Sequence, residues 1–253
     1  MKKKVAVVVP ACQEEVYIGK CLDSISSQTM NLSEVGCVII ENGSSDDTLR
    51  IVENYMSNYE TVIEKRKFRM GASRARDLGS KMALEKFNPD LVVFCDADTV
   101  LSPDFLEIAY NTILGKHVGG VPRVIYDPSL CENRLEYYDV KMQETINNLF
   151  SMWYHNVLPF PFPGYSPVLL ADSDYIKTRF GERGYLFNQH VEMGEELVFQ
   201  KELVNYGETI FLNDATATTS TRRWKKQGGF KVFLRGVIGQ FYKGQKWRVE
   251  DRL

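Results

Sequence analysis

The sequence predicts an α/β fold in which a mostly parallel sheet is flanked by helices. Two observations lead to this prediction. Over about the first 120 of the 253 residues, apolar runs alternate with segments whose apolar residues recur at helical spacing. The apolar runs are continuous and rich in β-branched residues, which is typical of strands buried on both faces of a parallel sheet.

Four strands and three helices are expected in this first part. The expected strands are Val5–Val9, Val35–Ile40, Glu60–Glu64 and Leu91–Cys95. The expected helices are Glu14–Ser27, a helix that opens near Ser44 and carries Val52, Tyr55 and Met56, and Ala72–Lys86. Ser44 and Asp47 have the spacing of a capping box, which predicts the start of the second helix.

The alternation stops beyond about residue 120. There the pattern predicts helices at Arg134–Tyr154 and Glu195–Tyr206, strands at Val168–Leu170 and Ile210–Leu212, and a proline-rich loop at Leu158–Pro167. The tail over residues 225–253 is basic, although Gly236, Gly239 and Gly244 weaken the case for a helix there. Its apolar residues follow the spacing of an amphipathic helix, at Phe230, Leu234, Val237, Ile238 and Phe241.

Composition and charge narrow the class of protein. A formal net charge of -2 does not fit the broad basic surface of a nucleic-acid-binding protein. The five cysteines are odd in number and form no CxxC pair, so we expect them to be reduced in a soluble, cytoplasmic protein. No apolar stretch approaches the roughly 20 residues of a membrane span, and the apolar run near Met1 is shorter than that of a signal peptide.

Two carboxylates follow the strand at Leu91–Cys95, with one residue between them. If the strand continues, Asp96 and Asp98 point to the same side, and two like charges so close are unfavourable without a cation or a hydrogen-bonded ligand. Polar clusters at Pro10–Glu14 and Glu41–Ser45 also follow strands. Ligands of such sheets bind beyond the carboxyl ends of the strands, so we expect one shared site. A plain acidic turn or a helix cap is the alternative for the two aspartates.

Five motifs occur in order along the chain: VAVVVPACQEEVYIGKCLDSI, CVIIENGSSDDT, GASRARDLG, CDADT and MGEELVFQKELVNYG. Together they resemble the motifs of family 2 glycosyltransferases of the GT-A fold, over roughly residues 4–224. The segment CDADT matches the DxD motif of that family. The chain departs from the family at Glu41 and Glu196, where Asp is usual, and at Cys12 and Gln13, where Tyr and Asn are usual.

The resemblance implies a nucleotide-diphospho-sugar donor and a divalent cation, Mn²⁺ or Mg²⁺, which hard carboxylate oxygens suit. Asp98 would then bind the metal directly, and Asp96 would face the ribose or the metal shell. By the same resemblance, the donor-binding residues are Pro10, Ala11, Glu14, Glu41, Asn42, Gly71, Arg76, Asp96, Ala97, Asp98 and Arg223. Arg222 is the alternative to Arg223 as a diphosphate contact.

Transfer of a sugar to a hydroxyl needs a base that removes the proton. The resemblance assigns this role to Glu196, with Glu195 second and Glu192 third, and it implies inversion at the anomeric carbon. Acidic residues also favour helix N-termini without any catalytic role, which is the alternative for this group. The acceptor stays open between a glycan, a lipid-linked molecule and a small polar molecule.

We therefore expect one glycosyltransferase domain over residues 1–224, with a nucleotide-sugar and metal half at about 1–122 and an acceptor half at about 123–224. The tail at 225–253 could lie on an anionic membrane as a peripheral contact, pack on the domain or join two copies. Two other functions stay open. One is a non-catalytic relative that only binds nucleotide sugars. The other is a sugar-phosphate nucleotidylyltransferase, although no Gly-rich phosphate loop follows the first strand.

Overall fold

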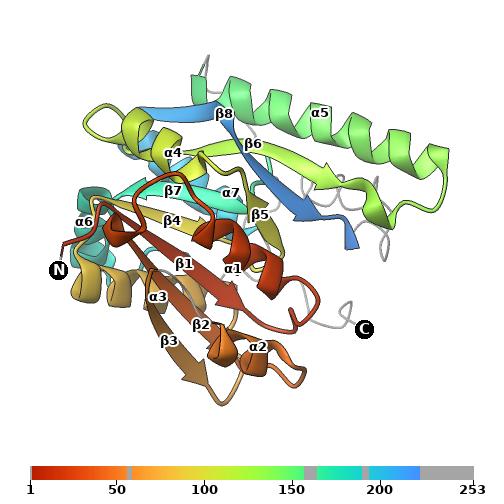
Figure 1. The fold of residues 1–253 in the computed structure, drawn as a ribbon. Coiled ribbons are helices and arrows are strands. Elements are labelled where there is room, and N and C mark those ends of the chain that lie inside the picture. Colours follow the sequence, from red (N-terminus) through yellow and green to blue (C-terminus); the bar gives the residue numbers. More distant parts are fainter. Residues whose placement is uncertain (1, 56–58, 157–163, 190–193, 223–253) are drawn as a thin grey trace.

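The computed structural model describes residues 2–55, 59–156, 164–189 and 194–222. Among these residues, eight strands form one sheet in the order β3-β2-β1-β4-β7-β6-β8-β5 (Figure 1). The strands are β1 (Val5–Ala11), β2 (Val35–Asn42), β3 (Glu60–Arg66), β4 (Leu91–Cys95), β5 (Thr99–Leu101), β6 (Gly119–Asp127), β7 (Val168–Asp172) and β8 (Thr209–Ser220).

The sheet is mostly parallel, as the sequence predicts. β3, β2, β1 and β4 pair in parallel, and so do β6 and β8. β7 is antiparallel to both of its neighbours, and β5 is antiparallel to β8. The carboxyl ends of β1, β2 and β4 therefore lie at one edge of the sheet, where a ligand of an α/β sheet is expected.

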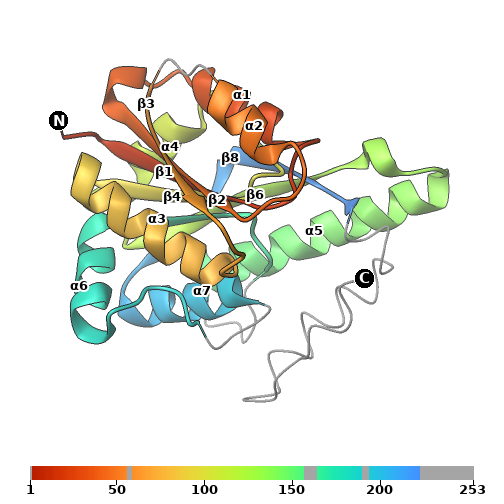
Figure 2. The same ribbon diagram turned by 90° about the horizontal axis from the view of Figure 1, so that it is seen from below.

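Helices cover both faces of the sheet (Figures 1 and 2). The helices are α1 (Ile18–Ser26), α2 (Thr48–Asn54), α3 (Ala72–Phe87), α4 (Phe105–Ile113), α5 (Arg134–Asn156), α6 (Ser173–Arg183) and α7 (Glu195–Tyr206), with short 3₁₀ helices η1 (Leu32–Glu34) and η2 (Pro128–Leu130). α1, α2 and α4 share one hydrophobic core, whereas α3, α6 and α7 share the other. α5 packs along β6 and β8.

The continuous apolar run of β1 has a direct physical reason in this arrangement. Val5, Val7 and Val9 belong to the core on the side of α1, α2 and α4. Ala6 and Val8 belong to the core on the side of α3, α6 and α7. Both sets of side chains are fully buried, so the strand has no polar face.

The four strands predicted in the first part are confirmed, and β1, β2 and β3 each extend two residues further. The helix predicted from Glu14 starts only at Ile18, because Gln13 has a φ of 60° and the following residues form a turn. The predicted capping box is wrong. The carboxylate of Asp46 accepts from the backbone N–H of Thr48 at 3.1 Å, while Ser44 bonds to a different loop.

Beyond residue 113 the sequence analysis missed α6 and β6 and underestimated the 12-residue β8. β6 opens with two glycines, which argue against a strand when only the sequence is known. A Cβ on Gly119 or Gly120 would stand 2.1 Å from a carbonyl oxygen of a neighbouring strand. These glycines therefore permit the close pairing of β6 with β7 and β8. β5 and α4 were missed as well.

Several predictions fall outside the described residues: the amphipathic tail at 225–253, most of the proline-rich loop, Met56, Glu192 and Arg223. Within the described residues, no helix combines the length and the apolar character needed to cross a membrane.

Candidate active site

The loops that follow β1 and β2 are joined by hydrogen bonds. The backbone N–H of Gln13 donates to Ser44 Oγ at 3.1 Å, and the backbone N–H of Ser45 donates to Gln13 Oε1 at 2.6 Å. The backbone N–H of Glu14 donates to Thr48 Oγ1 at 2.8 Å. Since Pro10 and Ala11 form the last residues of β1, this double loop fixes the backbone at the carboxyl edge of the sheet.

Glu41 and Asn42 end β2 with buried side chains that hold loops. Glu41 Oε1 accepts from the backbone N–H of Ser44 at 2.7 Å, and Asn42 Oδ1 accepts from that of Met70 at 2.8 Å. Their exposed fractions are 2% and 3%. Gly71, with a φ of 89°, precedes the first turn of α3. The donor contacts predicted for these residues stay predictions, and the structure gives each of them a local structural role.

Asp96, Ala97 and Asp98 form a tight turn between β4 and β5. The backbone N–H of Asp96 donates to the carbonyl of Pro167 at 2.9 Å, and that of Thr99 donates to the carbonyl of Asp96 at 3.0 Å. The expectation that the two aspartates continue a strand is therefore wrong. Asp96 and Asp98 nevertheless both lie close enough to Glu14 for their charges to raise its pKa, and we call these three carboxylates the acidic cluster.

Arg76 joins the two halves of the chain. Its guanidinium donates to Asp96 Oδ1 at 2.6 Å and to Glu195 Oε1 at 2.9 Å, and it lies over the ring of Phe187. Its side chain is 7% exposed. Burial lowers the pKa of Arg76, but the carboxylates around it, Asp96 foremost, outweigh burial and raise that pKa overall. Arg76 thus holds two carboxylates, and the phosphate contact expected of it stays a prediction.

Glu195 and Glu196 begin α7, directly after Gly194. Burial is the main cause that raises the pKa of the Glu196 carboxyl, to about 7, and the neighbouring charge of Glu195 adds to it. A carboxyl with a pKa near neutral exchanges protons readily at physiological pH, as a general base must. Glu195 is held by Arg76 at 2.9 Å, and the role of base expected for Glu196 stays a prediction.

Asp77 is a site residue that the sequence analysis missed. Its carboxylate accepts from the backbone N–H groups of Leu186 and Phe187, at 3.0 and 2.8 Å, and from the side-chain amide of Gln189 at 2.9 Å. It is 4% exposed, and burial raises its pKa. The signal was its position in GASRARDLG, directly after Arg76. Neighbouring residues of α3 thus hold the segment before α7 and the first residue of α7.

Arg222 lies inside the acidic cluster. Its guanidinium donates to both carboxylate oxygens of Glu14, at 2.6 Å for one of them, and lies 3.3 Å from Asp98 Oδ2. It also stacks over the ring of Tyr17. Burial raises the pKa of Glu14 to about 7, against the opposing effect of Arg222. Arg222 therefore lies at the acidic cluster, and the contact predicted for Arg223 stays a prediction because Arg223 lies outside the described residues.

The acidic cluster fits a divalent cation that arrives with a phosphate ligand. No three Asp, Glu, His or Cys side chains among the described residues form a ready-made metal site. Mg²⁺ commonly needs only one or two protein carboxylates when phosphate oxygens complete its shell. Glu14 and Asp98 already share one positive charge, the guanidinium of Arg222, so their oxygens are arranged around a cation.

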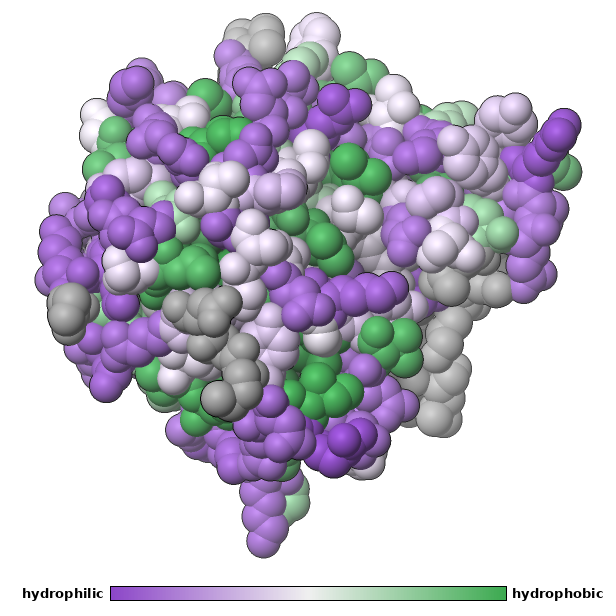
Figure 3. Space-filling model, viewed as in Figure 1, coloured by the Kyte–Doolittle hydropathy of each residue, from purple (hydrophilic) through white to green (hydrophobic). Residues whose placement is uncertain are grey.

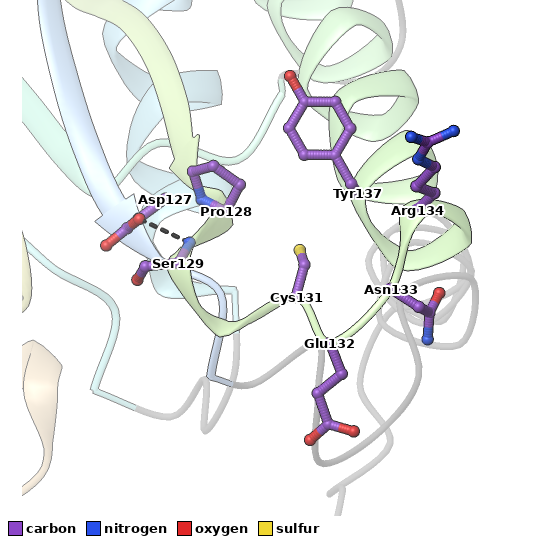
Figure 4. Close-up of a pocket in the computed structure, with 8 residues that line it drawn as sticks. All are labelled: Asp127, Pro128, Ser129, Cys131, Glu132, Asn133, Arg134 and Tyr137. Atoms are coloured by element: carbon purple, nitrogen blue, oxygen red, sulfur yellow. Dashed lines mark hydrogen bonds between the residues drawn. The ribbon is translucent and has the colours of Figure 1, made fainter.

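Two hollows lie near this edge of the sheet. The smaller, of about 40 Å³, touches Asp98 and is otherwise lined by Tyr17, Lys20, Val100, Asp127, Thr218, Thr219 and Ser220. The larger is an open hollow of about 550 Å³ at the start of α5 (Figure 4). None of the aspartates and glutamates of the cluster lines the larger hollow. The chemistry of the side chains, and not the size of the hollow, therefore locates the candidate site.

The sequence is similar to one protein family and to several curated glycosyltransferases. A sequence model of the family described as "Glycosyl transferase family 2" matches residues 6–166. The chain is 28% identical over 151 residues to glycosyltransferase AglE of Haloferax volcanii, which covers 56% of this chain and 48% of AglE. It is 31% identical over 111 residues to glycosyltransferase GlyA of Streptococcus pneumoniae, which covers 44% of this chain and 15% of GlyA. The chain thus spans less than half the length of either relative.

The fold is similar to that of several solved structures. The chain resembles S. aureus TarS 1-349 with a TM-score of 0.64 and 17% identity, over 98% of this chain and 68% of that one. A related TarS structure contains UDP-GlcNAc. A mannosyltransferase of Pyrobaculum calidifontis, in complex with GDP-Man and Mn²⁺, matches with a TM-score of 0.64 and 17% identity, over 95% of this chain and 64% of that one. At these identities the likeness is one of fold.

Proposed function

The chain belongs to glycosyl transferase family 2, and we propose that it transfers a sugar from a nucleotide-diphospho-sugar to a hydroxyl or phosphate of an acceptor. The observation that carries the proposal is the bridge made by Arg76. Its guanidinium donates both to Asp96, in the proposed donor half, and to Glu195, the first residue of α7. A donor bound at one and an acceptor bound at the other would meet at this bridge.

The donor half would bind the nucleotide diphosphate and the cation. Asp98 would be the direct ligand of Mn²⁺ or Mg²⁺, with Asp96 and Glu14 beside it. When bound, the cation would neutralise charge on the departing nucleoside diphosphate. The fold neighbours that hold UDP-GlcNAc, or GDP-Man with Mn²⁺, support this assignment by analogy. Arg222 would add positive charge at the same place.

The acceptor half would supply the base. Glu196 would remove the proton of the acceptor hydroxyl as its oxygen attacks the anomeric carbon. A pKa of about 7 leaves this carboxyl largely ionised at slightly alkaline pH and yet basic enough to accept a proton. Glu195, fixed by Arg76, would orient its neighbour. Inversion of the anomeric configuration is part of the proposal because the family resemblance implies it.

The proposal is tested by incubating the protein with UDP-glucose, UDP-GlcNAc and GDP-mannose, each with and without Mn²⁺, and by measuring release of UDP or GDP. We expect metal-dependent release from one donor, even without an acceptor, through slow hydrolysis. Asp98→Asn should abolish it. Nucleotide binding without release from any of these donors, in the presence of glycan and polyprenyl phosphate acceptors, would favour a non-catalytic nucleotide-sugar-binding relative instead.

A further inference from the structure

Residues 164–167 form a short segment that leads into β7 and lies directly against α5. We call it the 164–167 segment. A Cβ on Gly164 would stand 2.2 Å from Ser151 Oγ and 2.5 Å from the carbonyl oxygen of Asn147, two residues of α5. Real Cβ atoms do not come so close to other atoms, so only glycine permits this approach. The segment is therefore in contact with the helix at its first residue.

Asn147 holds the segment through both groups of its side-chain amide. Its Nδ2 donates to the carbonyl of Tyr165 at 2.8 Å, and its Oδ1 accepts from the backbone N–H of Tyr165 at 2.7 Å. The two bonds repeat the exchange that a neighbouring antiparallel strand would make. Asn147 is buried, so little water competes for these bonds. The backbone of Tyr165 is thereby fixed relative to α5.

α7 holds the same segment through Gln200. The side-chain nitrogen of Gln200 donates to the carbonyl of Gly164 at 3.1 Å, and its Oε1 lies 3.0 Å from Nε2 of His155. Burial lowers the pKa of His155 to about 4, so its ring is neutral at pH 7. An amide oxygen only accepts, so Nε2 of His155 carries the proton and donates to Gln200. Two helices of the proposed acceptor half thus fix the 164–167 segment.

Exposed side chains point to a function less clearly than these buried contacts. Over the face seen in Figure 3, hydrophobic residues lie scattered among hydrophilic ones, and single exposed apolar residues need no explanation. A buried polar group, in contrast, needs a partner, and the partner fixes its position. What the 164–167 segment positions is therefore shown by the contacts that it makes on the side of the candidate site.

The segment contacts Asp96 at two points. The carbonyl of Pro167 accepts from the backbone N–H of Asp96 at 2.9 Å. The hydroxyl of Tyr165 lies 3.4 Å from Asp96 Oδ2, a long hydrogen bond. An ionised carboxylate only accepts hydrogen bonds, so the phenol is the donor. The first contact fixes the backbone of Asp96, and the second acts on its side chain.

Arg76 by itself holds only one oxygen of the Asp96 carboxylate. Its Nη2 donates to Asp96 Oδ1 at 2.6 Å, while its Nη1 donates to Glu195 Oε1 at 2.9 Å. Because the two nitrogens are divided between two carboxylates, Arg76 does not form the two-bond fork that orients both oxygens of one carboxylate. A second donor at Oδ2 is needed to fix the plane of the Asp96 carboxylate. Tyr165 supplies this donor.

We propose that Tyr165 is a positioning residue for Asp96. Its hydroxyl holds Oδ2 while Arg76 holds Oδ1, so the carboxylate keeps one orientation toward the nucleotide diphosphate and its cation. The inference rests on the proposed function, in which Asp96 faces the ribose or the metal shell of the donor. Through Tyr165, residues of α5 and α7 contribute to the geometry of the donor site.

Nucleotide binding tests this role. UDP and GDP are titrated calorimetrically, in the presence of Mn²⁺, into the wild type, Tyr165→Phe and Tyr138→Phe. Tyr165→Phe removes only the hydroxyl and should weaken binding of the nucleotide that the wild type binds about fivefold. Tyr138, an exposed residue of α5, is the matched control, and Tyr138→Phe should leave the affinity unchanged.

Two outcomes separate this inference from the proposed function. Equal affinity of the wild type and Tyr165→Phe for the nucleotide would overturn the positioning role and leave the proposed function intact. Binding of neither nucleotide to the wild type would overturn the proposed function, and the positioning role with it.

A double-mutant cycle shows whether Tyr165 acts through Asp96. In Asp96→Asn the amide oxygen stays with Arg76, so an NH₂ group that cannot accept from the phenol takes the place of Oδ2. Without nucleotide, Tyr165→Phe should lower the thermal midpoint of unfolding by about 2 °C in the wild type and by less than about 0.5 °C in Asp96→Asn. Equal losses in both backgrounds would overturn the proposal, because Tyr165 would then stabilise the protein independently of Asp96.

Discussion

Two parts of the chain, which we propose to be the donor half (about residues 1–122) and the acceptor half (about residues 123–224), hold their acidic side chains in different ways. In the donor half, neighbouring loops hold each other, as Gln13 and Ser45 do across 32 residues. In the acceptor half, the position of Glu195 at the start of α7 depends on side chains of the donor half. Glu195 is held by Arg76 across 119 residues, and the segment before α7 is held by Asp77 across about 110. The donor site should therefore tolerate the loss of the Glu196 carboxylate, whereas the acceptor site should not tolerate damage to α3.

The largest effect on the rate of transfer is expected when Glu196, the proposed base, is replaced. Glu196→Gln keeps the shape of the side chain but cannot accept the proton, so the rate of transfer should fall by about 10²- to 10⁴-fold. Affinity for the nucleotide should stay within a factor of two. The measurement is steady-state transfer beside nucleotide titration. A larger loss in Glu195→Gln than in Glu196→Gln would assign the base to Glu195 and reverse their roles.

Removal of the Arg76 bridge between Asp96 and Glu195 should lower the free energy of unfolding. Arg76→Ala leaves the carboxylates of Asp96 and Glu195 without their cation, and loss of one partner of a buried ion pair costs about 3 kcal/mol of unfolding free energy. Urea denaturation measures the change. Arg74→Ala, an exposed residue two positions earlier on the same helix, is the control and should change stability by less than about 0.5 kcal/mol. Equal stability of the two variants would contradict the bridging role.

Variants of Asp77 distinguish an effect on the position of the segment before α7 from an effect on the overall stability of the protein. Asp77→Ala leaves the buried N–H groups of Leu186 and Phe187 without an acceptor, at a cost of about 2 kcal/mol. Asp77→Asn keeps one side-chain oxygen for them and should restore most of the transfer rate. In Asp77→Ala, kcat should fall while KM for the donor stays near its original value. A rise in donor KM with unchanged kcat would show that Asp77 serves the donor half.

The pH dependence should be the smallest effect. The Glu196 carboxyl must be ionised to act, and its pKa is raised to about 7, so the rate should fall as pH drops below 7. At saturating donor, the rate at pH 6 should be about one tenth of the plateau reached above pH 8. Saturation matters because burial also raises the pKa of Glu14 to about 7. A flat profile from pH 6 to 8 would point to a base with an ordinary carboxyl pKa.

The same comparison explains what could be predicted from the sequence. The strands β1, β2 and β4 are continuous apolar runs buried on both faces, and these three and the half-exposed edge strand β3 are all present where they were predicted. In the acceptor half, β6 opens with glycines that close backbone approach requires, and β8 is largely polar after its first four residues. Short-range patterns carry little signal for such strands, because their pairing partners lie far away in the chain.

The same contrast holds for the site residues: sequence motifs predict which residues take part, but not the contacts that depend on how distant elements pack. The motifs named the members of both acidic groups, including Asp96, Asp98 and Glu195. They could not reveal that Arg76 joins those groups, because that bridge depends on how α7 packs beside α3. Asp77 was missed for the same reason, since its partners are backbone N–H groups that no motif records. Asp96 and Asp98 lie in a turn and not in the predicted strand, and their side chains contact different arginines, Arg76 and Arg222.

The most direct test of the central claim, that donor binding and proton removal belong to different halves, is a calorimetric titration. UDP and GDP would be titrated in the presence of Mn²⁺ into the wild-type protein, Asp98→Asn and Glu196→Gln. We predict that one nucleotide binds the wild type and Glu196→Gln alike, and that Asp98→Asn weakens its binding at least tenfold. Equal weakening in both variants, or unchanged binding in Asp98→Asn, would contradict the division between the two halves.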